Sequence, residues 1–320
     1  MRLLVLLLVV VCGTAAAQYP AKPIKWIVPF PPGGPTDSFS RPVAQKLSEL
    51  LGQPVVVENI AGAGAAIGTD RLAKSAPDGY TVALATAGTH AINPHLYGAR
   101  LPYDALKDFT PVTLAVRYVN VLVVHPDVPV TSVAGLVAYA KANPNKVTFG
   151  SAGNGSTNHL SGEVLKYVTG APMQHVPYKG SAAALTDVIS GNLTCMFDIL
   201  VTSLPQARNR RVRALAVTSA ARSPFAPDIP TMEESGIKGY SDAGADLWFG
   251  IVAPAGLPGN IAEMLNSKLI EALRSPQVRE RLSAQAFEIW TSTPEEFGRV
   301  IRADYEKWGR IVKASGARID

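Results

Sequence analysis

The sequence predicts an α/β protein of two domains with a ligand cleft between them. Apolar and amphipathic runs alternate, and a strand, a Gly-rich turn and a helix start recur at residues 24–37, 55–68 and 147–159. Strands that alternate with helices favour parallel sheets with helices on both faces. The 320 residues, 47% of them hydrophobic, are enough for two cores.

The first segment has the pattern of a secretory signal at residues 1–17. Arg2 precedes an apolar run at 3–11, and small residues precede Gln18. The run is too short to cross a bilayer. Val11 stands where a lipoprotein needs a small residue before Cys12, so we expect cleavage after Ala17 and an exported, soluble chain. Cleavage would leave one cysteine and thus no intramolecular disulfide.

Charge excludes one class of partner. The formal charge is +5 and falls to +4 when Arg2 is removed. The basic residues are scattered except for a cluster at 208–213, which is typical of a solvated connection before a strand. Nucleic-acid binding requires a larger basic face with interleaved aromatic residues. We therefore expect no nucleic-acid partner.

Nine strands are expected from short apolar runs bounded by turns. They lie at 24–29, 54–58, 80–85, 119–124, 146–150, 173–176, 193–197, 212–218 and 247–252. Thr293, Pro294 and Glu296 form a capping-box pattern, which predicts a long amphipathic helix to about Ser315. Ser275 and Pro276 predict the start of a shorter one in the same way.

Two Pro-rich stretches, at 108–129 and 246–258, are expected to cross between the domains. Two crossings make one domain discontinuous. We predict a first domain of residues 18–120 plus 246–320 and a second of residues 121–245. Ligands of open α/β sheets bind beyond the carboxyl ends of the strands, so the cleft should collect several helix N-termini.

The first strand stops abruptly at Pro29, Pro31 and Pro32, because proline cannot donate to a sheet ladder. Gly33 and Gly34 then let the backbone approach a ligand closely. Free N–H groups at such a turn favour an anion. The alternative is an ordinary connection between strand and helix.

A second device of this kind is the Gly-rich stretch at 149–159. Ser156 or Thr157 can cap the helix that follows, and the N–H groups beside it can hold a carboxylate. Residues 176–181 repeat the pattern, with a serine at 181 before a helical run. Tyr178 there offers a ring wall and a hydroxyl, unless it is a tyrosine at the edge of the core.

Residues 60–69 contain three glycines after a strand, but their spacing does not fit a dinucleotide fingerprint, because Ile67 stands where the third glycine should be. We expect another helix N-terminus at the cleft and no nucleotide cofactor. The five histidines match no metal-ligand spacing, so no metal is expected. Ser156 and His159 are helix neighbours and no nucleophile motif is present, which argues against an enzyme.

Two aspartates are expected near the cleft, where a carboxylate that faced an anionic ligand would repel it. Asp37 and Asp198 each follow a strand and each can cap a helix. If either faces the cleft, it favours a ligand that carries an amine as well as a carboxylate.

Taken together, these stretches resemble the Bug-type extracytoplasmic solute-binding receptors of tripartite tricarboxylate transporters. The matching segments run in the family's order and lie at 29–37, 57–64, 77–80, 150–156 with His159, 175–180 and 253–258. Pro32 departs from the alanine of many relatives and removes one N–H donor from the first loop.

The resemblance implies a periplasmic two-domain Venus-flytrap fold that closes on a small carboxylate. N–H groups, hydroxyls and ordered water hold the ligand, which is a dicarboxylate, tricarboxylate, acidic amino acid or aromatic acid. The positions implied for ligand contact are Phe30, Pro32, Gly33, Thr36, Asp37, Ala61, Gly62, Gly64, Thr86, Thr89, Ser151, Gly153, Asn154, Gly155, Ser156, Thr157, His159, Tyr178 and Asp198.

The expected role is delivery of the ligand, by a monomer, to the membrane subunits of a transporter. A sensor that contacts a membrane signalling protein and an exported enzyme that uses Ser151 or Ser156 are the alternatives. We expect ligand to shift an equilibrium between open and closed forms.

Overall fold

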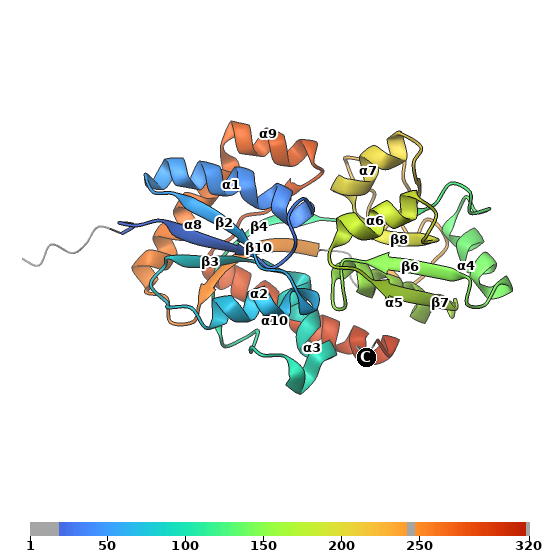
Figure 1. Cartoon of the computed structure of the whole chain (residues 1–320), viewed down its shortest axis with the longest axis horizontal. Helices are drawn as coiled ribbons and strands as arrows, with labels where there is room; N and C mark the ends of the chain where they lie inside the picture. The colour runs from blue at the N-terminus through green and yellow to red at the C-terminus, as the bar shows by residue number, and fades with distance from the viewer. Residues whose placement is uncertain (1–18, 242–246, 318–320) are drawn as a thin grey trace, which may run out of the picture.

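The computed structural model describes residues 19–241 and 247–317 of the chain, and the predicted signal sequence lies outside these residues. Two α/β lobes lie side by side along the long axis of the molecule (Figure 1). Each lobe has its own sheet, with helices on its faces. We call the lobe that contains residue 24 the first lobe and the other the second lobe.

The first lobe consists of a six-stranded sheet and its helices. Its strands are β1 (Ile24–Val28), β2 (Val55–Asn59), β3 (Thr81–Thr86), β4 (Phe109–Tyr118), β10 (Leu247–Pro254) and β11 (Glu288–Ile289). Its helices are α1 (Pro35–Leu51), η1 (Ala63–Ala65), α2 (Ala66–Ala73), η2 (Gly88–Ile92), α3 (Asn93–Tyr97), η3 (Gly98–Arg100), α8 (Gly259–Arg274), α9 (Pro276–Ala284) and α10 (Pro294–Ser315).

The second lobe consists of a five-stranded sheet and four helices among the described residues. Its strands are β5 (Asn120–Val124), β6 (Val147–Ser151), β7 (Met173–Pro177), β8 (Cys195–Ile199) and β9 (Arg213–Val217). Its helices are α4 (Val133–Ala142), α5 (Thr157–Thr169), α6 (Ser181–Ile189) and α7 (Leu200–Arg208).

Both sheets are mixed, so the prediction of parallel sheets is wrong in part. The strand orders are β11-β4-β10-β3-β1-β2 and β7-β6-β8-β5-β9. β1 pairs in parallel with β2 and β3, and β6 with β7 and β8. β10 is antiparallel to β3 and β4, and β5 is antiparallel to β8 and β9. β5 and β10 each follow a passage of the chain from one lobe to the other, and β11, within the first lobe, is antiparallel to β4.

The nine predicted strands are all present, within two residues at each end, whereas β4 and β11 were not predicted. Pro111 lies inside β4 and cannot donate to a sheet ladder. It pairs with Val252 of β10 next to a register shift, the kind of irregularity at which a sheet admits proline.

Only Val119 separates β4 of the first sheet from β5 of the second, so the chain crosses between the lobes there. It returns before β10, and residues 242–246, where the second predicted crossing begins, lie outside the described residues. The limits 18–120 plus 246–320 and 121–245 therefore stay a prediction for the two domains.

Each sheet is covered by buried apolar side chains. Trp26, Phe39 and Trp248 are among the largest fully buried residues of the first lobe. In the second lobe, Phe149 and Phe197 lie in the cluster on one face of the sheet and Met196 and Leu200 in the cluster on the other.

The long helix α10 contacts both lobes. Thr293 and Glu296 form the predicted capping box, and the helix ends at Ser315 as expected. Ser275 precedes α9 but makes no capping bond to it, because its hydroxyl donates to the carbonyl of Ala272. The far end of α10 reaches the second lobe below α5 (Figure 1), where Ile311 packs against the cores of both lobes.

Within residues 19–241 and 247–317, no helix is long and apolar enough to cross a bilayer.

Candidate functional site

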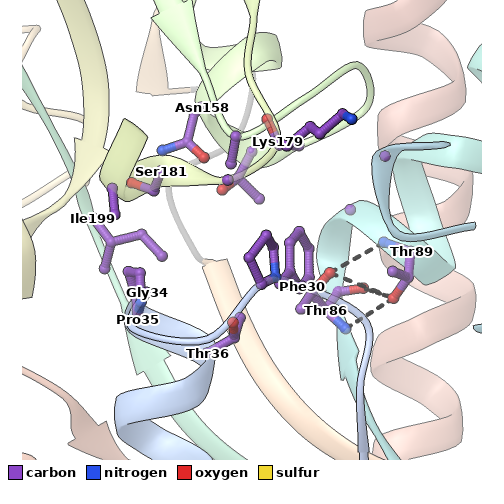
Figure 2. A pocket seen from close by; sticks show the side chains of 18 of the residues that line it. Phe30, Gly34, Pro35, Thr36, Thr86, Thr89, Asn158, Lys179, Ser181 and Ile199 are labelled. Carbon is purple, nitrogen blue, oxygen red and sulfur yellow. Dashed lines mark hydrogen bonds between the residues drawn. The ribbon is translucent and has the colours of Figure 1, made fainter. Parts of the chain in front are cut away.

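A cavity of about 230 Å³ lies between the lobes, and residues from both lobes line it. Figure 2 shows α1 on one side and the loops before α5 and α6 on the other. The lining residues are Phe30, Pro31, Pro32, Gly34, Pro35, Thr36, Gly64, Thr86, Gly88, Thr89, Tyr118, Ala152, Gly155, Ser156, Thr157, Asn158, Lys179, Gly180, Ser181, Ala182, Ala183, Ile199 and Phe249.

The first lobe contributes the N-terminus of α1. Gly34 is the N-cap and has no side chain to accept from the first turn, while Pro35 at the first position has no N–H. The carbonyl of Gly34 accepts from Asp37 and Ser38, which leaves the N–H of Thr36 without an acceptor among the described residues. This donor and the positive end of the helix dipole face the cavity wall.

The second lobe contributes the N-terminus of α5. The Ser156 hydroxyl accepts from the N–H of His159, and the Ser156 carbonyl accepts from Leu160. The N–H groups of Thr157 and Asn158 bond no acceptor in the described chain. Both residues line the cavity, so the predicted device at 149–159 presents two donors to it.

A third N-terminus is that of α6, which the second lobe also supplies. Its N-cap is Gly180, with φ of 117° and no side chain to cap the first turn. The next three residues, Ser181 to Ala183, line the cavity. Their N–H groups have no acceptor elsewhere in the described chain.

Three helix N-termini therefore converge on one cavity between the lobes. Each carries roughly half a positive charge on N–H groups that lack partners. Within the described lining, Lys179 is the only charged residue, and its side chain runs away from the helix termini in Figure 2. An anion with several acceptor oxygens, such as a carboxylate, satisfies these donors.

One wall of the cavity is held rigid by two threonines that bond each other. The N–H of Thr86 donates to the Thr89 hydroxyl at 3.0 Å, and the N–H of Thr89 donates to the Thr86 hydroxyl at 3.1 Å (Figure 2). The ring of Tyr103 adds a bond from its hydroxyl to the Thr89 carbonyl. The Thr89 hydroxyl also donates to the Thr86 carbonyl and contacts His90 Nδ1 at 2.8 Å, so its hydrogen bonds serve the wall rather than the cavity.

The remaining walls are apolar. Phe30 and Phe249 come from the first lobe, and Ile199 comes from the second. Tyr118 also lines the cavity, and its pKa is raised because its hydroxyl is buried, an effect that a bond to Thr157 of the second lobe partly offsets. The cavity thus combines anion-binding ends with a hydrocarbon-binding middle.

The lobes touch across the cleft at glycines, so the structure is closed. A Cβ on Gly64 would lie 2.0 Å from the carbonyl oxygen of Asn154, and one on Gly155 would lie 1.8 Å from the Asn93 side-chain oxygen. A Cβ on Gly88 would lie 3.0 Å from the Gly155 carbonyl oxygen. The two backbones approach each other here more closely than any residue with a Cβ allows.

Comparison with known proteins identifies the family. Residues 39–317 match the family described as the tripartite tricarboxylate transporter family receptor. The chain belongs to this receptor family. The predicted resemblance is therefore confirmed.

Three solved structures are similar to the receptor over nearly its whole length. The periplasmic binding protein BugD is 34% identical, with a TM-score of 0.88 over 94% of this chain and 99% of that one. A protein of R. palustris solved with adipate is 37% identical, with a TM-score of 0.89 over 94% and 100%. MatC of Rhodopseudomonas palustris, with bound malate, is 30% identical, with a TM-score of 0.87 over 92% and 100%.

These similarities confirm the two-domain periplasmic-binding-protein fold. They also place the receptor among solute-binding proteins of the periplasm and not among enzymes, so the alternative of an exported enzyme is set aside.

The structure brings the predicted site residues together in three groups. Those that line the cavity are Phe30, Pro32, Thr36, Gly64, Thr86, Thr89, Gly155, Ser156 and Thr157. Those that line an adjoining hollow on the outer side are Ala61, Gly62, Gly153, Asn154 and Tyr178, with Phe30 and Gly64 again. Those that line neither are Gly33, Asp37, Ser151, His159 and Asp198.

The two aspartates support loops of the receptor from behind. The Asp37 carboxylate accepts from the N–H of Gly33, from Arg41 at 2.8 Å and from Asn59. Bonds to these donors lower the pKa of Asp37 although partial burial opposes them. Asp37 thereby fixes the turn before α1 and is neutralised by Arg41, so an amine on the ligand is not needed to balance it.

Asp198 is fully buried behind the N-terminus of α6. Its carboxylate accepts from the hydroxyls of Ser181, Thr202 and Ser203. Burial raises its pKa, and the three hydroxyl bonds oppose this rise. Because Ser181 is the first residue of α6, Asp198 positions the donors of that helix.

Ser151 and His159 support the loop before α5. The Ser151 hydroxyl contacts His175 Nε2 at 2.7 Å and accepts from the N–H of Gly153. His159 Nδ1 accepts from the N–H of Gly155, and its ring stacks on His175 with centroids 4.0 Å apart. The loop that closes against the first lobe is thus held from below by two imidazoles.

Several lining residues of the receptor are not among the individual positions implied for ligand contact. Pro31, Gly34, Pro35 and the run 180–183 lie beside motifs that were recognised, so the motifs were the signal for them. Tyr118, Ile199 and Phe249 lie at strand ends next to the crossings between lobes, and only the three-dimensional arrangement exposes them to the cavity. Gly88, Ala152, Asn158 and Lys179 complete the set.

Replacing His159 by glutamine should reduce the loss of stability of the receptor in acid. Burial, helped by His175 and Lys166, lowers the pKa of His159 to about 3. In the unfolded chain His159 takes up a proton near pH 6.5, whereas in the folded chain it stays neutral down to about pH 3. The free energy of unfolding therefore falls as the pH falls from about 6.5 toward 3.

Between pH 7 and pH 5 we expect His159 to account for about 2 kcal/mol of lost unfolding free energy. Urea unfolding of the wild type and His159→Gln at both pH values measures this difference. Groups far from His159, such as Asp198, cancel in the comparison, whereas the stacked His175, whose pKa burial lowers to about 4, remains in both proteins and is checked by His175→Gln. An equal loss in both proteins would contradict a neutral, buried His159.

Proposed function

We propose that this receptor binds a small dicarboxylate with an apolar middle in the closed cleft and delivers it from the periplasm to the membrane subunits of a transporter. The observation that carries the proposal is the convergence of three uncapped or free-donor helix N-termini on a cavity with aromatic and aliphatic walls. The adipate and malate bound by two similar proteins support a carboxylate ligand.

Within the carboxylates, the arrangement of donors and charge favours a dicarboxylate. Donors at three helix N-termini surround an apolar middle, which suits two carboxylates joined by a short hydrocarbon segment. An acidic amino acid needs an acceptor for its ammonium group. The described lining contains no carboxylate, and Asp37 and Asp198 are occupied elsewhere.

The available donors are sufficient for useful affinity. Hydrogen bonds to a charged group contribute about 1.5–3 kcal/mol each, and micromolar binding requires about 8 kcal/mol. Four or five N–H groups of α1, α5 and α6 supply this after ordering costs, provided that closure excludes water. The glycine contacts across the cleft are the means of that exclusion.

Delivery follows from the two-state behaviour of such a fold. Ligand that contacts both lobes favours the closed form, and a membrane partner that recognises only this form receives loaded receptor. A membrane signalling protein that reads the same closed form is the alternative. We propose that the receptor acts as a monomer, binds no nucleic acid and needs no cofactor.

A calorimetric screen of ligand-stripped receptor tests the proposal. We expect adipate and malate to bind with micromolar affinity, citrate, aspartate and benzoate to bind at least about tenfold more weakly, and neutral adipamide not to bind. Small-angle scattering should show compaction with each binder. Tight binding of aspartate, or no binding of any carboxylate, would refute the proposal. Uptake of the preferred diacid by cells that lack the receptor separates transport from sensing. Loss of uptake supports delivery to a transporter, and unchanged uptake supports the signalling alternative.

A further inference from the structure

A second hollow adjoins the cavity on its outer side, with a volume of about 540 Å³. We call it the outer hollow. Both lobes build it: Pro29 to Pro31, Ala61 to Ala65, Ile67 and Tyr97 come from the first lobe, and Ala152 to Asn154 and Pro177 to Gly180 from the second. It therefore exists in this form only when the lobes are closed.

The two hollows share six lining residues: Phe30, Pro31, Gly64, Ala152, Lys179 and Gly180. The lobes approach closely at this boundary, because a Cβ on Gly64 would lie 2.0 Å from the Asn154 carbonyl oxygen and one on Gly180 would lie 3.2 Å from the Pro31 ring. A slender hydrocarbon chain suits such a boundary better than a branched or hydrated group.

The outer hollow has apolar walls and two polar side chains without partners. Pro29, Ile67, Tyr97 and Pro177 supply apolar surface. Among the described residues, the Lys179 ammonium forms no ion pair and the Asn154 amide makes no hydrogen bond. The Tyr178 hydroxyl is not available, because it donates to Asp187.

Lys179 links the two hollows. It lines both, and in Figure 2 its side chain runs along the loop away from Asn158, Ser181 and the other residues of the helix termini. The inner cavity thus presents backbone donors from three helix N-termini, and the Lys179 ammonium is the cation that lies toward the outer hollow. The distal charge of a ligand too long for the inner cavity finds its partner there.

Resting on the proposed function, we propose that the outer hollow is a second anion subsite, in which Lys179 and Asn154 bind the distal carboxylate of a diacid too long for the inner cavity. Lys179 then determines specificity for the second charge. Short diacids fit within the inner cavity and make no use of it. The receptor accordingly accepts diacids of different chain lengths. The distal carboxylate of a long diacid binds Lys179 and Asn154, whereas that of a short diacid binds within the inner cavity.

The test compares Lys179→Met with wild type over succinate, adipate, suberate and sebacate, and over the monoacids hexanoate and octanoate, by calorimetry. We expect Lys179→Met to weaken suberate and sebacate at least about tenfold more than it weakens the other ligands, since only the long diacids place a charge beside the ammonium. Lys179 is exposed, so the variant should fold, which its melting temperature checks.

Lys146→Met is the matched control. Lys146 is an exposed lysine of the same lobe at the other end of β6, and in the described chain its ammonium forms no ion pair. It should leave every affinity unchanged. If Lys179→Met weakened the binding of all anions equally, Lys179 would contribute only general electrostatic attraction, and the inference would be overturned. A stoichiometry of two for succinate would also overturn it, because a separate anion would then occupy the outer hollow.

The failure of this inference differs from the failure of the proposed function. If wild type binds no carboxylate, the proposed function falls and takes the subsite with it. If wild type binds the short diacids and Lys179→Met does not distinguish chain lengths, only the subsite falls.

Discussion

Replacing Gly155 by alanine is expected to lower dicarboxylate affinity at least about 100-fold while the receptor stays folded. The new Cβ would lie 1.8 Å from the Asn93 side-chain oxygen and 3.0 Å from Asn93 Cγ, and Asn93 is held by its bond to the Gly64 carbonyl. Asn93 belongs to the other lobe, so the clash arises only on closure. The open form tolerates the methyl group and cannot enclose the ligand.

The matched control is Gly170→Ala, at the C-cap of α5. Gly155 and Gly170 have φ of 79° and 65°, so alanine costs a similar ~1 kcal/mol of backbone strain at each. A Cβ on Gly170 would meet no atom within 4 Å. Calorimetry and urea unfolding of both variants separate closure from strain. Similar affinities in the two variants would show that the Gly155 contact does not limit closure.

Replacing Asp198 by alanine is expected to destabilise the receptor by about 2–4 kcal/mol, because buried hydroxyl donors lose their acceptor. Ser181 and Ser203 are both buried, and all three partners of Asp198 lie on α6 or α7. Affinity should fall as well, by about tenfold, since Ser181 begins the helix whose N–H groups face the cavity.

A double-mutant cycle with Ser203→Ala tests this account by urea unfolding. Once Ser203 has lost its hydroxyl, Asp198→Ala leaves one fewer donor unpaired, so the two losses should be less than additive by about 1 kcal/mol. Thr202→Ala is the milder comparison, because Thr202 is only half buried and its hydroxyl also donates to the Ile199 carbonyl. Strict additivity would show that Asp198 does not organise these hydroxyls.

The sequence predicted the nine strands well, because each is a short apolar run that a turn terminates. It did not predict strand direction. A run such as β10 is apolar whether its neighbours are parallel or antiparallel, so its direction depends on the tertiary arrangement. β4 was not predicted, and Pro111 inside it cannot donate to a sheet ladder.

The site residues were likewise predictable where the signal is local in sequence and not where it depends on the tertiary arrangement. The helix N-termini were predictable, because glycine, proline and serine have local backbone meanings at a helix start. The roles of Asp37 and Asp198 were not, because their partners Asn59 and Ser181 are distant in sequence. The membership of Tyr118 and Phe249 in the lining also depends on how the two lobes meet.

The glycine contacts across the cleft have a consequence for how specificity can be altered. Backbone atoms meet backbone atoms where Gly64 approaches Asn154 and Gly88 approaches Gly155. The fit of the lobes at these points does not depend on the identity of the ligand-facing side chains. A substitution at Ile199 or Phe249 can therefore reshape the recognition surface without altering the closing motion. Selectivity and mechanics are separable in this scaffold, which makes it suitable for reprogramming as a sensor of other diacids.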